Sequence, residues 1–310
     1  MNFPRKLTAS AACAILMYSQ TTLADGVGAV ASLYRNMANV GISLNVSQQN
    51  IQATPTLVRG IYKLTVKPSG QFMSYVNEGG TITGDHKGWQ VIASPPRPMN
   101  NRELSELRGD VMRHIDFDKL IKVEYGDGGG RKMVMFSAVD CPFCKKFEAN
   151  AARLASSMNT TFYVVPSALR PLSYGLVPLQ NWRTATNIWC AKDNASAWRA
   201  YWSSNSLPAS QSCAFDERTA EEMGNQLEEL FSSVGINKHG VPTILREDGA
   251  IFTPRPDFDK SYATSIFGSV ALASFQSVYD EKSSKWLAES KSSDSKQLNL
   301  GDAVQKLFRN

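Results

Sequence analysis

Two cysteines three positions apart are the residues of this chain best suited to chemistry. Cys141 and Cys144 enclose Pro142 and Phe143, and an apolar run over 132–138 precedes them. That run predicts a β-strand, and apolar positions at helical spacing after the motif predict a helix. Pro142 fits the first helical turn, where the N–H that proline lacks has no intrahelical partner. Cys141 would then lie at a helix N-terminus, which favours a thiolate.

A thiolate in this position attacks disulfides, and a second cysteine one turn later can resolve the mixed disulfide that forms. A zinc half-site is one alternative, but zinc needs a second ligand pair, and the chain has no other Cys-x-x-Cys and only 3 histidines. A short structural disulfide is the other alternative. The pattern favours redox chemistry by the cysteines themselves, with no metal and no cofactor expected.

Pro242 is the second position of interest, because it begins an apolar run that predicts a strand. Proline removes a donor from a strand ladder and is unusual there. It fits if the peptide bond after Val241 is cis and the strand start faces the cysteine pair. The backbone of Val241 would then be free to bind an extended substrate. An ordinary loop proline is the alternative.

The 310 residues are enough for two domains with sizeable cores. We predict five parts, with these boundaries: a signal peptide over 1–24, an N-terminal domain over 25–95, a linker helix over 96–125, a catalytic domain over 126–260 and a C-terminal extension over 261–310. In the second part, a helix ending at Gly41 precedes strands over 56–66, 71–76, 81–84 and 89–92. Its core is small, and such a unit often pairs with a second copy of itself.

The third part predicts a helix over 101–121. The fourth part predicts, in order, the strand and the helix around the cysteine pair, a strand over 161–165, helices over 183–234 and a hairpin that ends at residue 253. This alternation of strands and helices indicates an α/β layout. The extension predicts a helix over 262–279, a flexible serine- and lysine-rich segment over 283–295 and a short terminal helix over 298–308. It contains no motif for chemistry.

The first residues are typical of a secretory signal. Arg5 and Lys6 precede a mostly apolar stretch over 9–18, and Ala24 supplies the small residue that cleavage needs. No later stretch approaches the length of a membrane span. Removing Arg5 and Lys6 lowers the formal charge of +5 by two, which is too mild a charge to indicate nucleic-acid binding.

Cleavage after Ala24 would leave four cysteines. An even count in an exported protein suggests two disulfides. If Cys141 and Cys144 form the redox pair, Cys190 and Cys213 remain for a structural bridge.

The chain resembles the bacterial periplasmic disulfide isomerases of the DsbC/DsbG family over about 26–256. The resemblance is carried by the Cys141-to-Cys144 centre, by Pro242, by the segment Trp189-Cys190-Ala191-Lys192-Asp193 with Cys213 following, and by the order of the domains.

This resemblance implies a thioredoxin-like C-terminal domain with a helical insertion and a small cystatin-like α+β dimerisation domain, joined by a helical linker. It implies that Cys141 attacks, Cys144 resolves, Pro242 is a cis-proline, and Cys190 pairs with Cys213. It further implies a periplasmic V-shaped homodimer whose apolar cleft holds misfolded exported proteins, with chaperone activity. A membrane thiol reductase of the DsbD type would supply its electrons.

Two residues depart from the family pattern. The dipeptide Pro142-Phe143, which tunes the reactivity of the Cys141 sulfur, stands where isomerases often carry Gly-Tyr or Pro-Tyr. Val241 stands where they usually have threonine, and valine there resembles the oxidase DsbA. A DsbA-like dithiol oxidase is therefore an alternative, as is a chaperone without redox turnover.

Overall fold

The structure is a computed structural model that describes residues 14–85, 88–127, 130–208, 215–233, 240–247 and 249–268. The segments predicted over 283–295 and 298–308, and most of the helix predicted over 262–279, lie outside these residues. So do His86, His239 and Cys213.

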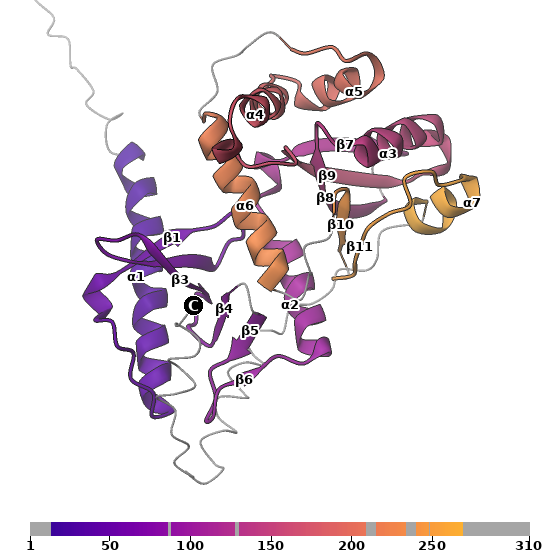
Figure 1. The fold of residues 1–310 in the computed structure, drawn as a ribbon. Helices are drawn as coiled ribbons and strands as arrows, with labels where there is room; N and C mark the ends of the chain where they lie inside the picture. The colour runs from indigo at the N-terminus through magenta and orange to yellow at the C-terminus, as the bar shows by residue number, and fades with distance from the viewer. Residues whose placement is uncertain are drawn as a thin grey trace, which may run out of the picture.

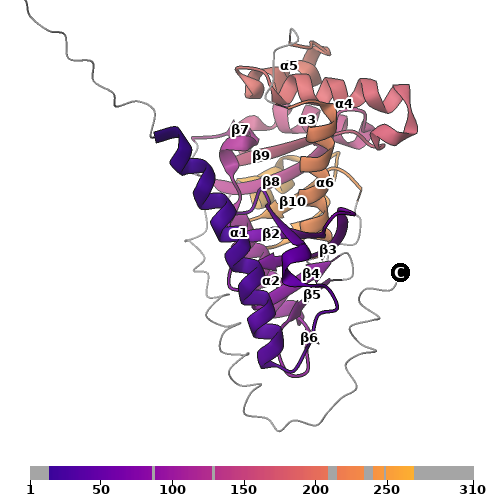
Figure 2. The ribbon, with the colours of Figure 1, turned by 90° about the vertical axis from the view of Figure 1, so that its left-hand side faces the viewer.

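An antiparallel six-stranded sheet with sequential strand order forms the N-terminal part. Its strands are β1 (Ile51–Pro55), β2 (Ile61–Val66), β3 (Gln71–Asn77), β4 (Ile82–Asp85), β5 (Gly88–Val91) and β6 (Arg97–Pro98). Helix α1 (Ala14–Asn39) lies along this sheet (Figures 1 and 2). Its buried Leu33 packs in one cluster with Leu64 and Val76 of the strands. The helix ends just before Gly41, as predicted, because Gly41 adopts a φ of +77° that terminates helices.

One strand of this sheet differs from the prediction. The strand expected over 56–66 begins only at Ile61, and residues 51–55 form the additional strand β1. A tight turn separates the two strands, since the Thr56 hydroxyl accepts the Val58 N–H at 3.1 Å and Gly60 has a φ of +79°. Pro55 and Gly60 flank this turn, but Leu57 and Val58 between them extend the apolar pattern of the strand that follows.

The second sheet has five strands in the order β11-β10-β8-β9-β7. They are β7 (Ile121–Tyr125), β8 (Arg131–Ala138), β9 (Thr160–Ser167), β10 (Thr243–Arg246) and β11 (Ile251–Phe252). The central strands β8 and β9 are parallel, and the other pairings are antiparallel.

Six further helices accompany this sheet: α2 (Asn101–His114), α3 (Pro142–Arg153), α4 (Leu176–Trp189), α5 (Asn194–Ser204), α6 (Glu217–Ser233) and the single turn α7 (Lys260–Tyr262). Short 3₁₀ turns lie at Gln48–Asn50, Phe117–Lys119, Ala155–Ser157 and Leu172–Tyr174, and a π-helical turn lies at Ala263–Phe267. Helices α3, α4 and α5 gather at the end of the molecule away from the N-terminal sheet in both ribbon views (Figures 1 and 2).

The predicted linker helix is shorter than expected and is followed by a strand. It starts at Asn101 because Asn100 forms a capping box with Glu103. It ends at His114, and residues 121–125, assigned above to the linker, form the edge strand β7 paired with β9. Buried and exposed residues alternate along β7, which is the period of a strand with one covered face.

The core of the second part extends past residue 260, where the sequence placed the start of the extension. Phe258 and Phe267 are fully buried and pack around Phe147, with ring centroids 5.4 and 5.9 Å away. The Phe267 carbonyl also accepts the Thr160 hydroxyl at 2.7 Å. Residues up to Phe267 therefore complete this core.

The two sheets share one continuous cluster of buried side chains. It includes Tyr75 and Trp89 from the N-terminal sheet, Leu107 of α2, and Val123 and Met135 from the second sheet. Helix α6 contacts strands of both sheets, and Figure 1 shows it running from one to the other. In the part of the chain that the structure describes, no helix is both long and apolar enough to cross a bilayer.

Candidate functional site

Strand β8 and helix α3 position the cysteine pair. Strand β8 ends at Ala138, and Cys141 is the N-cap residue of α3 with Pro142 in the first helical turn. The Cys141 sulfur accepts the Cys144 N–H at 3.4 Å. One of the N–H groups that a helix start leaves without an intrahelical partner is thus directed at this sulfur.

Both cysteines are free thiols in this structure. Cys141 is 4% exposed and Cys144 is completely buried. They cluster with Ala138, and Trp202 and Val241 pack against them. Cys141 therefore keeps a small exposed fraction, whereas Cys144 keeps none.

The start of strand β10 closes the site from the other side. The Val241–Pro242 peptide bond is cis, and Thr243 pairs with Phe136 of β8. The Cys141 thiol donates to the Val241 carbonyl at 3.3 Å. The fold therefore brings Val241 and Pro242 next to the Cys141–Cys144 pair, although Cys141 and Val241 lie 100 residues apart in the sequence.

The environments of the remaining predicted site residues differ. Pro142 and Phe143 are exposed, Phe143 to 58%. Cys190 caps the C-terminus of α4 and is disulfide-bonded. Because Cys213 lies outside the described residues, its pairing with Cys190 stays a prediction.

Burial has a chemical consequence for the second cysteine. Loss of solvent raises the pKa of the Cys144 thiol well above its usual range, and the neighbouring Cys141 raises it further. Cys144 is therefore held as a protonated thiol.

Asp140 is a site residue that the sequence did not single out. One carboxylate oxygen accepts the Leu169 N–H at 2.9 Å, and the other accepts the Asn181 side-chain amide at 2.7 Å. The residue next to Cys141 thus fixes both the segment after β9 and helix α4. The sequence carries no local signal of this role, because both partners are distant along the chain.

A groove of about 390 Å³ lies beside Cys141. The start of α3 and the end of α5 line it, including Lys145, Tyr201, Trp202 and Asn205. The Tyr201 hydroxyl donates to the Val139 carbonyl at 2.9 Å, which fixes the wall of the groove to the turn before Cys141.

Glu148 is a buried acid one turn after Cys144. Its carboxylate accepts the Trp198 indole N–H at 3.0 Å. Burial raises the pKa of Glu148 to about 7, although Trp198 and Arg199 act in the opposite direction. The helical spacing of α3 predicts that Glu148 faces solvent, and this prediction is wrong because the side chain is buried.

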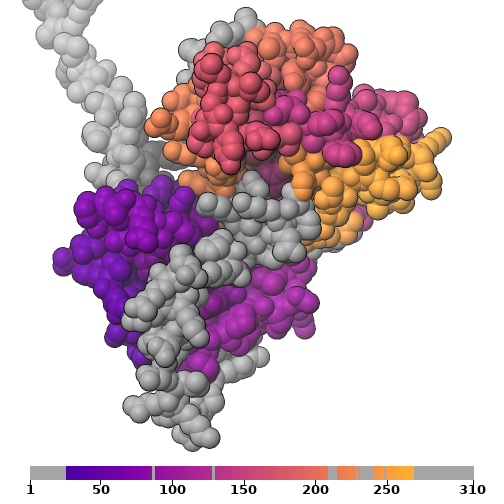
Figure 3. Space-filling model, in the orientation of Figure 1, coloured from indigo at the N-terminus to yellow at the C-terminus, as the bar shows by residue number. Residues whose placement is uncertain are grey.

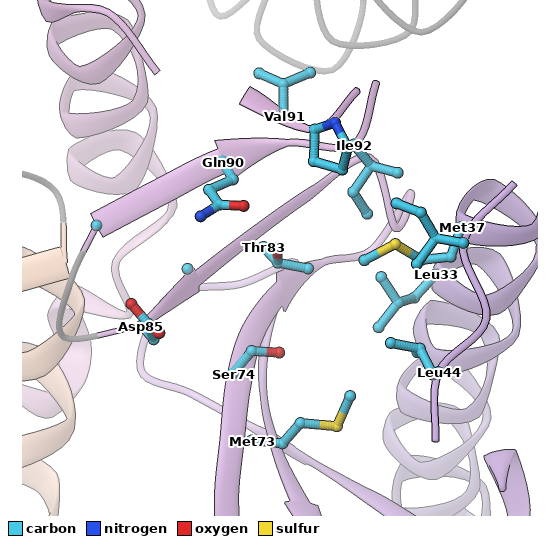
Figure 4. A pocket seen from close by; sticks show the side chains of 14 residues that line it. Leu33, Met37, Leu44, Met73, Ser74, Thr83, Asp85, Gln90, Val91 and Ile92 are labelled. Atoms are coloured by element: carbon cyan, nitrogen blue, oxygen red, sulfur yellow. The ribbon is translucent and has the colours of Figure 1, made fainter. Parts of the chain in front are cut away.

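A second hollow lies between α1 and the N-terminal sheet, away from the cysteines (Figure 4). It has a volume of about 50 Å³ and a mostly apolar lining that includes Leu33, Met37, Leu44 and Met73.

Among the described residues, no group of three or more His, Cys, Asp or Glu side chains is arranged to hold a metal ion.

Comparisons with known proteins agree with this geometry. Residues 119–255 match the family model of a thioredoxin-like domain. The chain is 22% identical over 165 residues to a probable thiol:disulfide interchange protein DsbC from Bordetella parapertussis, covering 52% of this chain and 55% of that relative. A Bordetella bronchiseptica protein of the same name matches equally. The chain thus spans about half the length of the curated relatives it matches.

Solved structures of disulfide interchange proteins are also similar. One from Neisseria gonorrhoeae shares 28% identity, covering 45% of this chain and 87% of that one, with a TM-score of 0.35. The thiol-disulfide exchange protein alpha-DsbA2 from Wolbachia pipientis shares 12% identity, covering 54% and 97%, with a TM-score of 0.36.

The predicted fold class, an α+β chain with a thioredoxin-like second part, is confirmed. Residues 119–255 match a thioredoxin-like domain, and the chain is similar to proteins named thiol:disulfide interchange protein DsbC.

Proposed function

We propose that the protein is a thiol:disulfide oxidoreductase that rearranges and reduces wrong disulfides in other proteins. The observation that carries this proposal is the placement of Cys141 at the start of α3, with the buried thiol of Cys144 behind it. Disulfide exchange begins with attack by a cysteine thiolate, and Cys141 at the start of α3 is the cysteine in position to attack.

The reaction begins when the Cys141 thiolate attacks one sulfur of a client disulfide. A mixed disulfide forms, and the other client cysteine leaves as a thiolate. If a different client thiolate, for example one freed when the leaving thiolate attacks a second client disulfide, then attacks the client sulfur of the mixed disulfide, a new client disulfide forms and Cys141 leaves as a thiolate. If Cys144 attacks instead, the client leaves reduced, and two electrons from a membrane thiol reductase must restore the Cys141–Cys144 disulfide to thiols.

The burial of Cys144 fits its role as the resolving thiol. Its raised pKa keeps this thiol protonated before a client binds, so Cys141 is the member of the pair that attacks first. The two-part layout, with an N-terminal sheet before the thioredoxin-like part, favours the isomerase over the oxidase.

We place this activity in the periplasm, with residues 1–24 as a cleaved signal peptide and misfolded exported proteins as clients. Cys190 and Cys213 form the structural bridge. A membrane reductase of the DsbD type is the electron donor. The N-terminal sheet forms a homodimer whose cleft gives chaperone activity. The similarity to relatives named thiol:disulfide interchange protein supports this setting.

The test uses the reduced full chain with Cys144→Ser, reacted with client proteins that contain wrongly paired disulfides, and alkylation then quenches the remaining thiols. The variant should accumulate a mixed disulfide at Cys141 that a reductant releases, because the resolving thiol is missing. Cys141→Ser is the control and should trap nothing. Equal trapping by both variants would contradict the assigned roles.

A dithiol oxidase is the second candidate, favoured by Val241, whose carbonyl contacts the Cys141 thiol. Equilibration of the Cys141–Cys144 pair with glutathione measures the reduction potential of the pair, which distinguishes an oxidase from an isomerase. A strong oxidase has a reduction potential of about −120 mV, and an isomerase is more reducing, at roughly −180 mV. A chaperone without redox turnover is the third candidate function. Such a protein would keep its whole cellular role when Cys141 is replaced in the Cys141→Ala variant.

A further inference from the structure

The resolving step requires a negative charge on a buried sulfur. Cys144 is completely buried, and burial raises the pKa of its thiol well above the usual range. Resolution nevertheless needs a thiolate on this sulfur, because a thiol attacks a disulfide far more slowly than a thiolate does. A charge in such a place is stabilised by hydrogen-bond donors directed at it. A donor beside Cys144 would therefore speed the release of a client.

Helix α3 directs Cys144 towards the end of strand β8. In Figure 3 the surface around residues 140–155, which includes α3, adjoins the surface around residues 170–190. Part of α3 thus reaches the surface, but Cys144 and Phe147 lie on its buried side. On that side Ala138, the last residue of β8, forms one buried cluster with both cysteines. The end of β8 is therefore the part of the sheet that lies against the cysteine pair.

Ser137, the residue before Ala138, carries a hydroxyl without a partner. Its side chain is completely buried, and its oxygen makes no hydrogen bond to any of the residues that the structure describes. Burying a hydroxyl in this way costs stability, and such groups are rare in native proteins. An alanine at this position would avoid the cost. The free thiol state of the protein thus gives this hydroxyl nothing to do.

The same hydroxyl acts on the ionisation of Cys144. Burial has the largest effect on the pKa of this thiol and raises it, whereas the side chain of Ser137 and the backbone of Ala138 lower it. A hydroxyl lowers the pKa of a neighbouring thiol when its O–H stabilises the thiolate. The partner that the Ser137 hydroxyl lacks is therefore present only when Cys144 carries its charge.

We propose that Ser137 is a catalytic residue of the resolving step, in which its O–H donates to the Cys144 sulfur as the thiolate forms there. The inference deepens the proposed function and rests on it. The donor is in place before the charge appears, so little reorganisation is needed during the reaction. Its hydrogen bond exists in the reacting state and not in the free thiol state, which is the condition for an interaction to accelerate a step.

The step balances within the cysteine pair. Cys144 loses its proton to the solvent, and its thiolate, held by the Ser137 hydroxyl, attacks the Cys141 sulfur of the mixed disulfide. A Cys141–Cys144 disulfide forms, and the client cysteine leaves as a thiolate. Ser137 keeps its own proton throughout.

The test separates the two cysteines in time with the symmetrical disulfide of nitrothiobenzoate. In the reduced full chain, the Cys141 thiolate attacks this reagent, and a first coloured nitrothiobenzoate leaves as a thiolate. Cys144 then attacks the mixed disulfide on Cys141 and releases a second one. Stopped-flow absorbance thus records a first phase that reports on Cys141 and a second phase that reports on Cys144. The Cys144→Ser variant should show the first phase only.

Ser137→Ala should leave the first phase unchanged and slow the second phase roughly three- to tenfold. Losing one hydrogen bond to a charged sulfur lowers the thiolate population of Cys144 by about 10- to 100-fold. The more basic thiolate is a stronger nucleophile, which offsets roughly half of this loss on a logarithmic scale. Ser137→Thr keeps the hydroxyl and should restore the second phase.

Ser74→Ala is the matched control. The Ser74 hydroxyl is also buried in a strand, and it too makes no hydrogen bond within the described part of the chain. Both alanine variants should resist urea at least as well as the wild type, because each removes an unpaired polar group from the interior. Only Ser137→Ala should combine this undiminished stability with a slower second phase.

Three results would overturn the inference while a normal first phase still supports the proposed function. They are a second phase in Ser137→Ala as fast as in the wild type, an equal slowing by Ser74→Ala, and a second phase in Ser137→Thr as slow as in Ser137→Ala. If the first phase is the same in Cys141→Ala as in the wild type, the proposed function fails, and the inference with it.

Discussion

The two cysteines of the redox pair are identical in chemistry but differ in surroundings. Cys141 receives a helix N–H and contacts the Val241 carbonyl, whereas Cys144 is enclosed one turn later. Because the enclosed thiol stays protonated, the pair divides attack and resolution between its members. This division at the scale of single residues is the physical basis of the proposed thiol–disulfide exchange.

The buried Glu148 leads to a prediction about how the stability of the fold depends on pH. Burial raises its pKa from 4.5 to about 7 in the folded chain, so the folded state binds this proton more tightly than the unfolded state does. Its contribution to stability is therefore fully present below pH 4.5 and is lost as the pH rises towards 7. The loss between pH 5 and pH 8 should be about 2 to 3 kcal/mol.

Glu148→Gln cannot ionise and should remove this part of the pH dependence. Urea unfolding of the wild type and the variant at both pH values measures the difference, with the exposed Glu222→Gln as control. Parallel stability profiles for the wild type and Glu148→Gln would show that the carboxyl does not titrate in this range.

At the scale of elements, the β10–β11 hairpin packs on α2 through a glycine. Gly249 has a φ of +79°, and a Cβ there would lie 2.4 Å from the Ser105 carbonyl oxygen. Gly70 has a similar φ of +68° but open space around it. Gly70→Ala should cost about 1 to 2 kcal/mol for the backbone conformation alone. Gly249→Ala should cost roughly 1 to 3 kcal/mol more, because α2 must move.

Unfolding in urea compares the two alanine variants directly. Equal losses would mean that the hairpin and α2 do not pack as closely as the structure has them.

The segment after α7 gives a second prediction about an element. Phe267→Ala should lower the free energy of unfolding by about 3 to 5 kcal/mol, as expected for a large aromatic side chain removed from a core. Thr264→Ala changes an exposed side chain of the same turn and should have little effect. Thermal and urea unfolding of the full chain test this. A small loss for Phe267→Ala would place the end of the folded part before residue 263.

The elements differ in how far the sequence could predict them. The redox strand and helix were predictable, because an apolar run, a proline in the first turn and helical spacing all agree. Strand β7 has a local signal, because Ile121, Val123 and Tyr125 alternate with two charged residues, but the helical pattern of the preceding segment runs up to it and hides its start. The burial of Phe267 depends on rings from β9 and α3, and no local pattern reports such contacts. The same holds for Asp140 and Glu148 in the site.

At the scale of the whole molecule, the two sheets share one buried cluster, and α6 joins them. Strand β1 forms one edge of the N-terminal sheet, and most of its residues are exposed. An exposed sheet edge is a template for pairing with another chain. We predict that the purified protein is a dimer in solution. Light scattering should give twice the mass of one chain at micromolar concentration, and the mass of a single chain would contradict the prediction.

The central claim is best tested by the recovery of a scrambled substrate. Reduced protein is mixed with a multi-disulfide enzyme whose cysteines are wrongly paired, and the return of that enzyme's activity is followed over time. We predict recovery that depends on Cys141 and is absent in Cys141→Ala. No recovery with the reduced form, together with fast oxidation of a reduced substrate by the oxidised form, would contradict the isomerase and establish an oxidase instead.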